Sequence, residues 1–479
     1  MQQYRSNYSE QSAPYLRWLS KHQIEALHSA SIEVLERTGT RVDHPEALTL
    51  LKDAGCIVND KVVRIPGWLV EECLRLAPKK IVMGNRKGER VISLEKNRTY
   101  FGTGSDLPFT IDLETRERRF SIKDDIIKSV RVLDSLPNFD FVMSNAIATD
   151  VPAELNEVHQ FEAMLVNTVK PLVFTSYNEK NTYKIIEMAA AAVGGVDNLR
   201  KSPLMALYSE PISPLVHTFD GISKMFACLE YGVPVIYTPG VVAGGTTPVT
   251  KAGTIVQMNA ESLAGLVIAQ LKYKGAPIII GGGATPMDMR TSSTLYGSPD
   301  AQMNYCAMTE LSQYYEVPNF TEAGCSNAAF PDAQAGMEAS IGLLMSQLSG
   351  ANLVHDVGYL DGGKTGSLAF LVMCEEFISA ARHIGRGTKV TDNTMALDVI
   401  DKVGPGGQFI SNPHTAKNFR EEIWMSDIFN TSMWDQWEAN GKKTLYEVAE
   451  DKARNILTNH KPEPLKDSVL EEIKRILED

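Results

Sequence analysis

Short, apolar, β-prone runs recur through the middle of this 479-residue chain at intervals of 30 to 43 residues. The seven runs begin at Phe141, Leu172, Met205, Val235, Ile278, Asn319 and Asn352. Amphipathic helical patterns lie between them, for example over residues 185–193 and 260–271. Alternation of strand and helix at this pitch is the βαβ signature and requires a parallel sheet.

The number of strands favours a closed barrel over an open sheet. An eighth strand near Thr99–Gly102 or after Gly385 would complete an α/β fold of the TIM (β/α)8 barrel type over residues 96–400. A doubly wound open sheet is the alternative, but the glycine-rich nucleotide fingerprint of that fold is missing. Residues 1–95 are expected to form an N-terminal α/β extension packed on the barrel, with a capping-box helix start at Ser20. Residues 401–479 are expected to form a C-terminal helical segment.

Charge and cysteine usage restrict the partners and the compartment. Lysine and arginine total 47 against 59 acidic residues, a net charge of −12, which argues against nucleic acid as the main partner. The six cysteines lie far apart without a CxxC pair, so a reducing cytoplasm is the default. The N-terminus is polar and lacks an apolar signal core, and no run of 18 apolar residues exists to span a membrane.

In a barrel of this type the chemistry sits at the carboxyl ends of the strands. The residues at those ends are Asn145, Ser176, Tyr208, Glu210, Tyr237, Gly281–Gly283, Glu322 and His355. No lysine stands among them, although a Schiff-base aldolase would need one there. They show no Asp/Glu/His cluster, and none of the nine histidines forms HxH or HExxH, so we expect no metal site.

Several strand-end features have two interpretations. The run Gly281-Gly-Gly-Ala-Thr-Pro286 could bind phosphate, or its glycines could clear volume at the mouth. His217 and His355 could hold a ligand or be hydrogen-bonded structural residues. Cys325 could be a nucleophile, but the sequence shows no adjacent base.

A set of motifs spread over nearly the whole chain resembles the trimethylamine methyltransferase family. The segments that carry the resemblance are 244–253, 288–291, 297–300, 331–338, 404–409, 414–415, Trp424 and 437–441. The resemblance implies a TIM-barrel methyltransferase that delivers a methyl group from a methylamine to the Co(I) corrinoid of a small separate protein. It also implies a homo-oligomer, with the corrinoid cofactor bound by the partner protein and no cofactor bound by this chain.

Archetypal members of that family carry pyrrolysine deep in the barrel. The corresponding segment here, Gly324–Phe330, contains only standard residues. The chain therefore resembles the pyrrolysine-lacking branch, whose known members demethylate quaternary amines such as glycine betaine, proline betaine and carnitine. Chemistry agrees with this division, because a quaternary ammonium leaves as a neutral tertiary amine and needs neither a general acid nor a covalent residue.

A cavity for such a substrate needs aromatic faces and counter-charges for the ammonium, and a donor for a betaine carboxylate. The candidate cage residues are Phe101, Phe109, Phe174, Tyr208, Tyr237 and Tyr359, although ordinary core packing is the commoner role of a barrel aromatic. The candidate counter-charges are Glu210 and Glu322, and Gly282 belongs to the glycine run at the mouth. The candidate carboxylate holders are His217, His355 and Arg290.

Two other functions remain open at this point. A barrel lyase or aldolase for a small acid would turn over without a corrinoid protein. A non-catalytic quaternary-amine binder would bind a betaine tightly without methyl transfer.

Overall fold

A computed structural model describes residues 14–478; the polar segment 1–13, on which the signal-peptide argument rests, lies outside them. Seven parallel strands form one sheet in the order β6-β18-β17-β14-β12-β10-β9. Single bridges from Gly102 to Phe141 and from Val142 to Leu172 join its two edges through an eighth short segment. The sheet is thus a closed barrel, and the open doubly wound alternative is wrong. The strand bounds are β6 Tyr100–Phe101, β9 Leu172–Phe174, β10 Met205–Ser209, β12 Val235–Tyr237, β14 Ile278–Gly281, β17 Asn319–Glu322 and β18 Leu353–His355.

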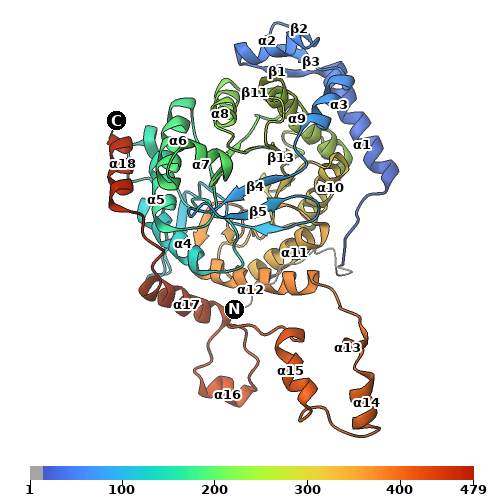
Figure 1. The fold of residues 1–479 in the computed structure, drawn as a ribbon, viewed down its shortest axis with the longest axis vertical. Coiled ribbons are helices and arrows are strands. Elements are labelled where there is room, and N and C mark those ends of the chain that lie inside the picture. The colour runs from blue at the N-terminus through green and yellow to red at the C-terminus, as the bar shows by residue number, and fades with distance from the viewer. Residues whose placement is uncertain (1–13, 479) are drawn as a thin grey trace.

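Of the two places considered for the remaining strand, the one near Thr99–Gly102 is correct, since β6 pairs with β18 there, and the one after Gly385 is wrong. Helices follow the strands and cover the outside of the barrel (Figure 1). They are α4 Lys123–Ser135, α5 Asn156–Asn167, α6 Glu179–Val193, α7 Val196–Lys201, α8 Phe219–Glu230, α9 Lys251–Lys272, α10 Pro299–Tyr315, α11 Ala333–Ser349 and α12 Leu368–Gly385. Local chemistry sets their ends: the side chains of Asn178 and Thr218 accept backbone N–H groups at the starts of α6 and α8.

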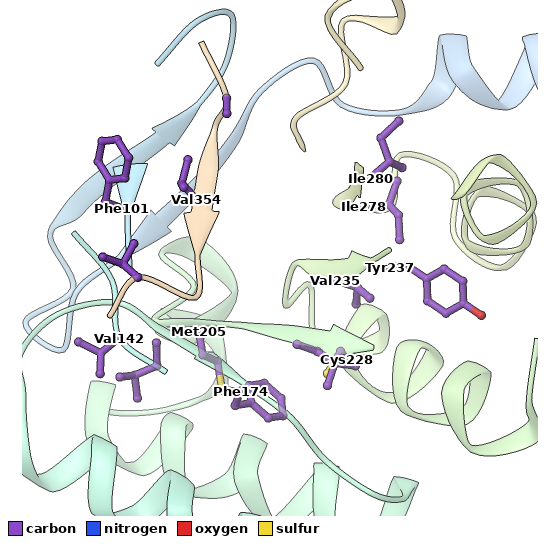
Figure 2. Close-up of a cluster of buried hydrophobic side chains, with 14 of the residues drawn as sticks. Phe101, Val142, Phe174, Met205, Cys228, Val235, Tyr237, Ile278, Ile280 and Val354 are labelled. Atoms are coloured by element: carbon purple, nitrogen blue, oxygen red, sulfur yellow. The ribbon is translucent and has the colours of Figure 1, made fainter. Parts of the chain in front are cut away.

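Strand residues alternate between the helices and the barrel interior, as the pleat requires. Phe101, Phe174 and Tyr237 face outward and pack in the layer beneath the helices (Figure 2). Their neighbours face inward and form a separate cluster inside the barrel: Phe141, Val173, Ala206, Ile236, Ile279, Phe320 and Leu353.

A hairpin of the N-terminal region closes one end of the barrel. Strands β4 (Ile81–Gly84) and β5 (Arg90–Leu94) lie across it (Figure 1) and add Ile81, Met83, Ile92 and Leu94 to the interior cluster. The Gly84 N–H donates to the Pro203 carbonyl, just before β10, so the hairpin closes the amino-terminal end of the strands. A functional site is therefore expected at the opposite end of the barrel, where the strands have their carboxyl ends.

The rest of the N-terminal region packs on the outside. Helix α1 (Lys21–Glu33) begins with the expected capping box at Ser20 and packs on α9 and α10. A small sheet in the order β11-β1-β3-β2 lies beyond it. The elements are η1 Val34–Thr38, β1 Thr40–Val42, α2 Pro45–Asp53, β2 Ile57–Asn59, β3 Val62–Arg64, α3 Gly67–Leu76 and β11 Val216–His217.

Short strands rise from the carboxyl ends of the barrel strands and frame the mouth. They form two small sheets, β13-β15-β16 and β19-β20-β7-β8. Their bounds are β7 Phe109–Ile111, β8 Arg118–Phe120, β13 Gly240–Ala243, β15 Gly283–Asp288, β16 Ser293–Thr294, β19 Tyr359–Leu360 and β20 Thr365–Ser367; a 3-10 turn, η2, spans Ala153–Leu155.

The C-terminal region is helical, as the sequence predicts. Helix α17 (Leu445–Asn459) packs on α12 and α4, and α18 (Asp467–Glu478) packs on α6 and α5. Between α12 and α17 the chain makes an excursion away from the barrel (Figure 1). It holds α13 Asp392–Met395, α14 Leu397–Val403, α15 Pro413–Glu422 and α16 Trp434–Ala439. Within residues 14–478, no helix is both long and apolar enough to cross a membrane.

Candidate active site

Alternation along the strands brings a polar group of side chains to the carboxyl-terminal mouth. Tyr208 on β10 and Glu210 just after it share the inward parity of Ala206, and Glu322 on β17 shares that of Phe320. His355 ends β18 with the inward parity of Leu353. Neighbouring parallel strands hold these side chains together, because their carboxyl ends meet at one edge of the barrel.

The contacts within this group are specific. The Tyr305 hydroxyl of α10 donates to Glu322 Oε2 at 2.5 Å, and the Tyr208 hydroxyl donates to Glu210. His355 Nδ1 lies 2.8 Å from Asp356 Oδ1. The His355 ring stacks on Phe320 with centroids 3.9 Å apart and 14° between the planes. Three carboxylates, those of Glu210, Glu322 and Asp356, and one imidazole therefore lie close together at the mouth.

Two glycines make room for the carboxylates. A Cβ on Gly283 would lie 1.8 Å from Glu322 Oε1, and a Cβ on Gly104 would lie 1.9 Å from Asp356 Oδ1. Both distances are far below van der Waals contact, so any side chain at either position would displace an acid. This role of Gly283 supports the interpretation that the glycine run clears volume at the mouth.

Burial and mutual repulsion perturb the acids. Burial raises the pKa of Glu322 to about 7, with the nearby Asp356 carboxylate adding to the rise. Burial likewise raises the pKa of Glu210. For His355, burial alone would lower the pKa, but the Asp356, Glu322 and Glu210 carboxylates together raise it. The site thus favours positive charge, on the imidazole or on a ligand.

Solvent reaches part of this group. Glu210 and Tyr208 keep solvent-accessible surface although protein surrounds them closely enough to raise the pKa of both through burial. Tyr296 and Tyr359 stand at the same mouth, packed with Leu107 and Cys325.

The structure brings five of the predicted site residues to the mouth: Tyr208, Glu210, Glu322, His355 and Tyr359. The Tyr359 hydroxyl donates to the Ser105 carbonyl at 2.5 Å. Gly282 lies on the wall, where its Cβ would meet the Pro239 carbonyl oxygen at 2.4 Å. Contact of these residues with a substrate stays a prediction.

The structure does not bring the other predicted residues there. Phe101, Phe174 and Tyr237 face the helices (Figure 2), because they occupy the outward positions of their strands. Phe109 lies in the small sheet around the mouth, where it stacks on Phe120.

The two remaining carboxylate holders are also displaced. His217 is fully buried, 2.9 Å from the Tyr237 hydroxyl, and burial lowers its pKa to about 4, so it stays neutral. Arg290 extends into solvent with 88% of its side chain exposed and pairs with Asp288. Of the three candidates, only His355 reaches the mouth.

The structure resolves the open interpretations as well. Gly281–Gly283 leads into strand β15 and not into a helix N-terminus, so the phosphate-loop interpretation loses its basis. Burial raises the Cys325 pKa well above its usual value, which keeps a protonated thiol and removes the nucleophile.

Sequence reasoning missed several members of the group. Asp356 directly follows His355 and could have been found, whereas Tyr296 and Tyr305 reach the mouth only through tertiary packing. The expectation that the strand ends hold no Asp/Glu/His cluster is wrong: metal-ligand-type atoms of Glu322, His355 and Asp356 all lie within 4.8 Å of one another. Lys224 of α8 also comes near Glu210, but its ammonium donates to the Ser176 carbonyl at 2.6 Å.

Fold and site together define a (β/α)8-barrel enzyme whose mouth is lined by acids, tyrosines and one histidine. The family model for trimethylamine methyltransferase (MTTB) matches residues 1–478, and the chain belongs to that family. It is therefore an enzyme of the methyltransferase class.

Several proteins of named function are similar to this chain over most of their length. A trimethylamine methyltransferase MttB of Desulfitobacterium hafniense is 33% identical over 97% of this chain and 94% of its own. A glycine betaine methyltransferase from another strain of that species is 28% identical over 95% of both. The solved monomethylamine methyltransferase MtmB of Methanosarcina barkeri superposes with a TM-score of 0.53 at 14% identity, covering 95% of this chain and 90% of that one, which supports the fold.

Proposed function

We propose that this chain transfers a methyl group from a quaternary amine, glycine betaine or a related betaine, to the Co(I) corrinoid of a separate cognate protein. The observation that carries the proposal is the group of side chains at the mouth, where Glu210, Glu322 and Asp356 lie beside the rings of Tyr208 and Tyr305. Carboxylates and aromatic faces attract an ammonium, with about 0.5–2 kcal/mol for each ring. Kinship with a glycine betaine methyltransferase supports the same substrate class.

For this reaction the protein needs mainly to position the substrate methyl group. Co(I) attacks the methyl carbon in line, the C–N bond breaks, and its electron pair stays on nitrogen as a neutral tertiary amine. The products are that amine and methyl-Co(III). No proton is transferred, which fits a mouth where Cys325 is held as a thiol. The residues at the mouth bind the cation, aim one methyl outward and exclude water.

The partners follow from this reaction. The corrinoid of the cognate protein must reach the mouth, so the small sheets β13-β15-β16 and β19-β20-β7-β8 would form part of its docking surface. We propose that the corrinoid belongs to the partner and that this chain binds no cofactor of its own. A homo-oligomer in the cytoplasm stays a prediction from the family resemblance and the cysteine usage.

A cobalt absorbance assay tests the proposal. Enzyme is mixed with a Co(I)-reduced corrinoid protein and, in turn, glycine betaine, proline betaine, carnitine, choline and trimethylamine. Loss of the Co(I) band with a betaine is the expected result. Activity on trimethylamine alone would contradict the substrate class. Turnover of a small acid without a corrinoid protein would instead favour a lyase.

A further inference from the structure

The His355 imidazole is a buried polar group with unused hydrogen-bonding capacity. Its side chain is 3% exposed, yet within residues 14–478 neither ring nitrogen makes a hydrogen bond of proper geometry. Nδ1 lies 2.8 Å from Asp356 Oδ1, an ion-pair contact without hydrogen-bond alignment. Buried polar atoms are nearly always satisfied, so an unpartnered one at the mouth points to a ligand that supplies the acceptor.

The ring is held in place. Phe320 stacks on one face, and the Tyr208 ring meets His355 edge to face with centroids 5.6 Å apart. Asp356 is fixed in turn, because Gly104 leaves just enough room for its carboxylate. With Nδ1 committed to Asp356, Nε2 is the atom left for a ligand inside the barrel.

The charges around the ring favour its protonated form. Three carboxylates raise the His355 pKa: Asp356 has the largest effect, followed by Glu322 and Glu210. The Lys224 ammonium lowers the pKa of Glu210, but it donates its hydrogen bond to the Ser176 carbonyl. An imidazolium at this place can accept a second anionic partner while Glu210 remains available for a cation.

We infer that His355 binds the carboxylate of a betaine substrate through Nε2 and that Asp356 positions the imidazole for this purpose. The inference rests on the proposed function and sharpens it. The ammonium then lies on the side of Tyr208 and Glu210, which share a hydrogen bond at the same mouth. His355 thereby becomes the residue that distinguishes a betaine from an amine cation of the same shape.

The test compares glycine betaine with its primary amide, which keeps the trimethylammonium head and the shape but lacks the negative charge. Binding to the full-length enzyme is measured by calorimetry, without any corrinoid protein. For His355→Gln we expect a ten- to hundredfold weaker affinity for glycine betaine and less than a threefold change for the amide. His22→Gln, on an exposed side chain of α1, is the matched control and should change neither affinity.

A second variant keeps the imidazole. Asp356→Asn removes the carboxylate that raises the His355 pKa. Affinity for glycine betaine is expected to be lost as pH rises and His355 loses its proton, and in this variant the loss should occur at a lower pH than in the wild type. Amide binding should show no such shift.

Equal losses for both ligands in His355→Gln, or a wild-type preference for the amide, would overturn the inference. An unshifted pH profile in Asp356→Asn would remove the positioning role of Asp356. Betaine binding that depends on His355 but never leads to cobalt methylation would leave the inference standing and refute the proposed methyl transfer.

Discussion

Replacing Glu210 by glutamine should weaken substrate binding without slowing the chemical step. The amide oxygen still accepts the Tyr208 hydroxyl, so the local geometry is kept while the charge is removed. A carboxylate about 5 Å from an ammonium contributes about 3 kcal/mol at an effective dielectric constant of about 20. Because water reaches Glu210, about 2 kcal/mol is the better figure, equivalent to roughly 30-fold in KM.

The direction of the kcat effect follows from the reaction. The ammonium loses its charge as the methyl group leaves, so Glu210 stabilises the bound substrate more than the transition state. We therefore expect KM to rise about 30-fold while kcat is unchanged or higher, measured as initial rates of Co(I) loss. Glu187→Gln, at an exposed position of α6, is the control. A fall in kcat at unchanged KM would refute the assignment of Glu210 as counter-charge.

Four further predictions follow from the described contacts. Gly283→Ala should reduce kcat/KM at least tenfold and lower stability by about 1–3 kcal/mol, measured by rates and denaturant unfolding, because its Cβ would displace the Glu322 carboxylate. The pKa of Glu322 is raised to about 7 in the folded protein, whereas in the unfolded chain it returns to the ordinary glutamate value. The free energy of unfolding should therefore fall as pH rises from about 5 to 7, and Glu322→Gln should flatten that slope. Arg382→Met should cost about 3–5 kcal/mol in a denaturant titration, because it removes the buried guanidinium that pairs with the Asp140 carboxylate, whose side chain is only 13% exposed; a loss below 1 kcal/mol would contradict this. Incubation with EDTA should leave the methyl-transfer rate within twofold; a loss restored by added Zn²⁺ would instead reassign the cluster of Glu322 and its neighbours to a metal.

The barrel could be predicted from the sequence because its signal is periodic and long. The pitch of the strand-like runs indicated seven of the strands, and one of two proposed places for the eighth was correct at Tyr100–Phe101. The helices between the strands are amphipathic, so their positions were also visible. The sequence does not predict the β4-β5 hairpin that closes the amino-terminal end of the barrel, since such a hairpin has no distinct local pattern.

Side-chain direction could not be predicted in the barrel strands. A strand covered by helices outside and a packed interior inside is apolar on both faces, so Leu172–Phe174 shows no alternation of polarity. The prediction that Phe101, Phe174 and Tyr237 line the interior is wrong for this reason, because all three face the helices. Where the strand end carries polar residues at alternate positions, as at Tyr208 and Glu210, the direction was correct.

Residues supplied by the loops and helices needed the structure. Arg290 was proposed from its place in a motif, but its own Asp288 holds it in solvent. Tyr305 comes from the first turns of α10 and reaches Glu322 across the barrel wall, a contact between residues that no sequence pattern links.

The most direct test of the central claim is to follow the methyl group itself. Glycine betaine labelled with ¹³C in its N-methyl groups is incubated with the enzyme and a Co(I) corrinoid protein, and the products are examined by NMR. The account predicts one labelled methyl on cobalt for each molecule of dimethylglycine formed, with none when the enzyme is omitted. Label that stays entirely in the betaine, across several corrinoid proteins and with the other betaines, would contradict it.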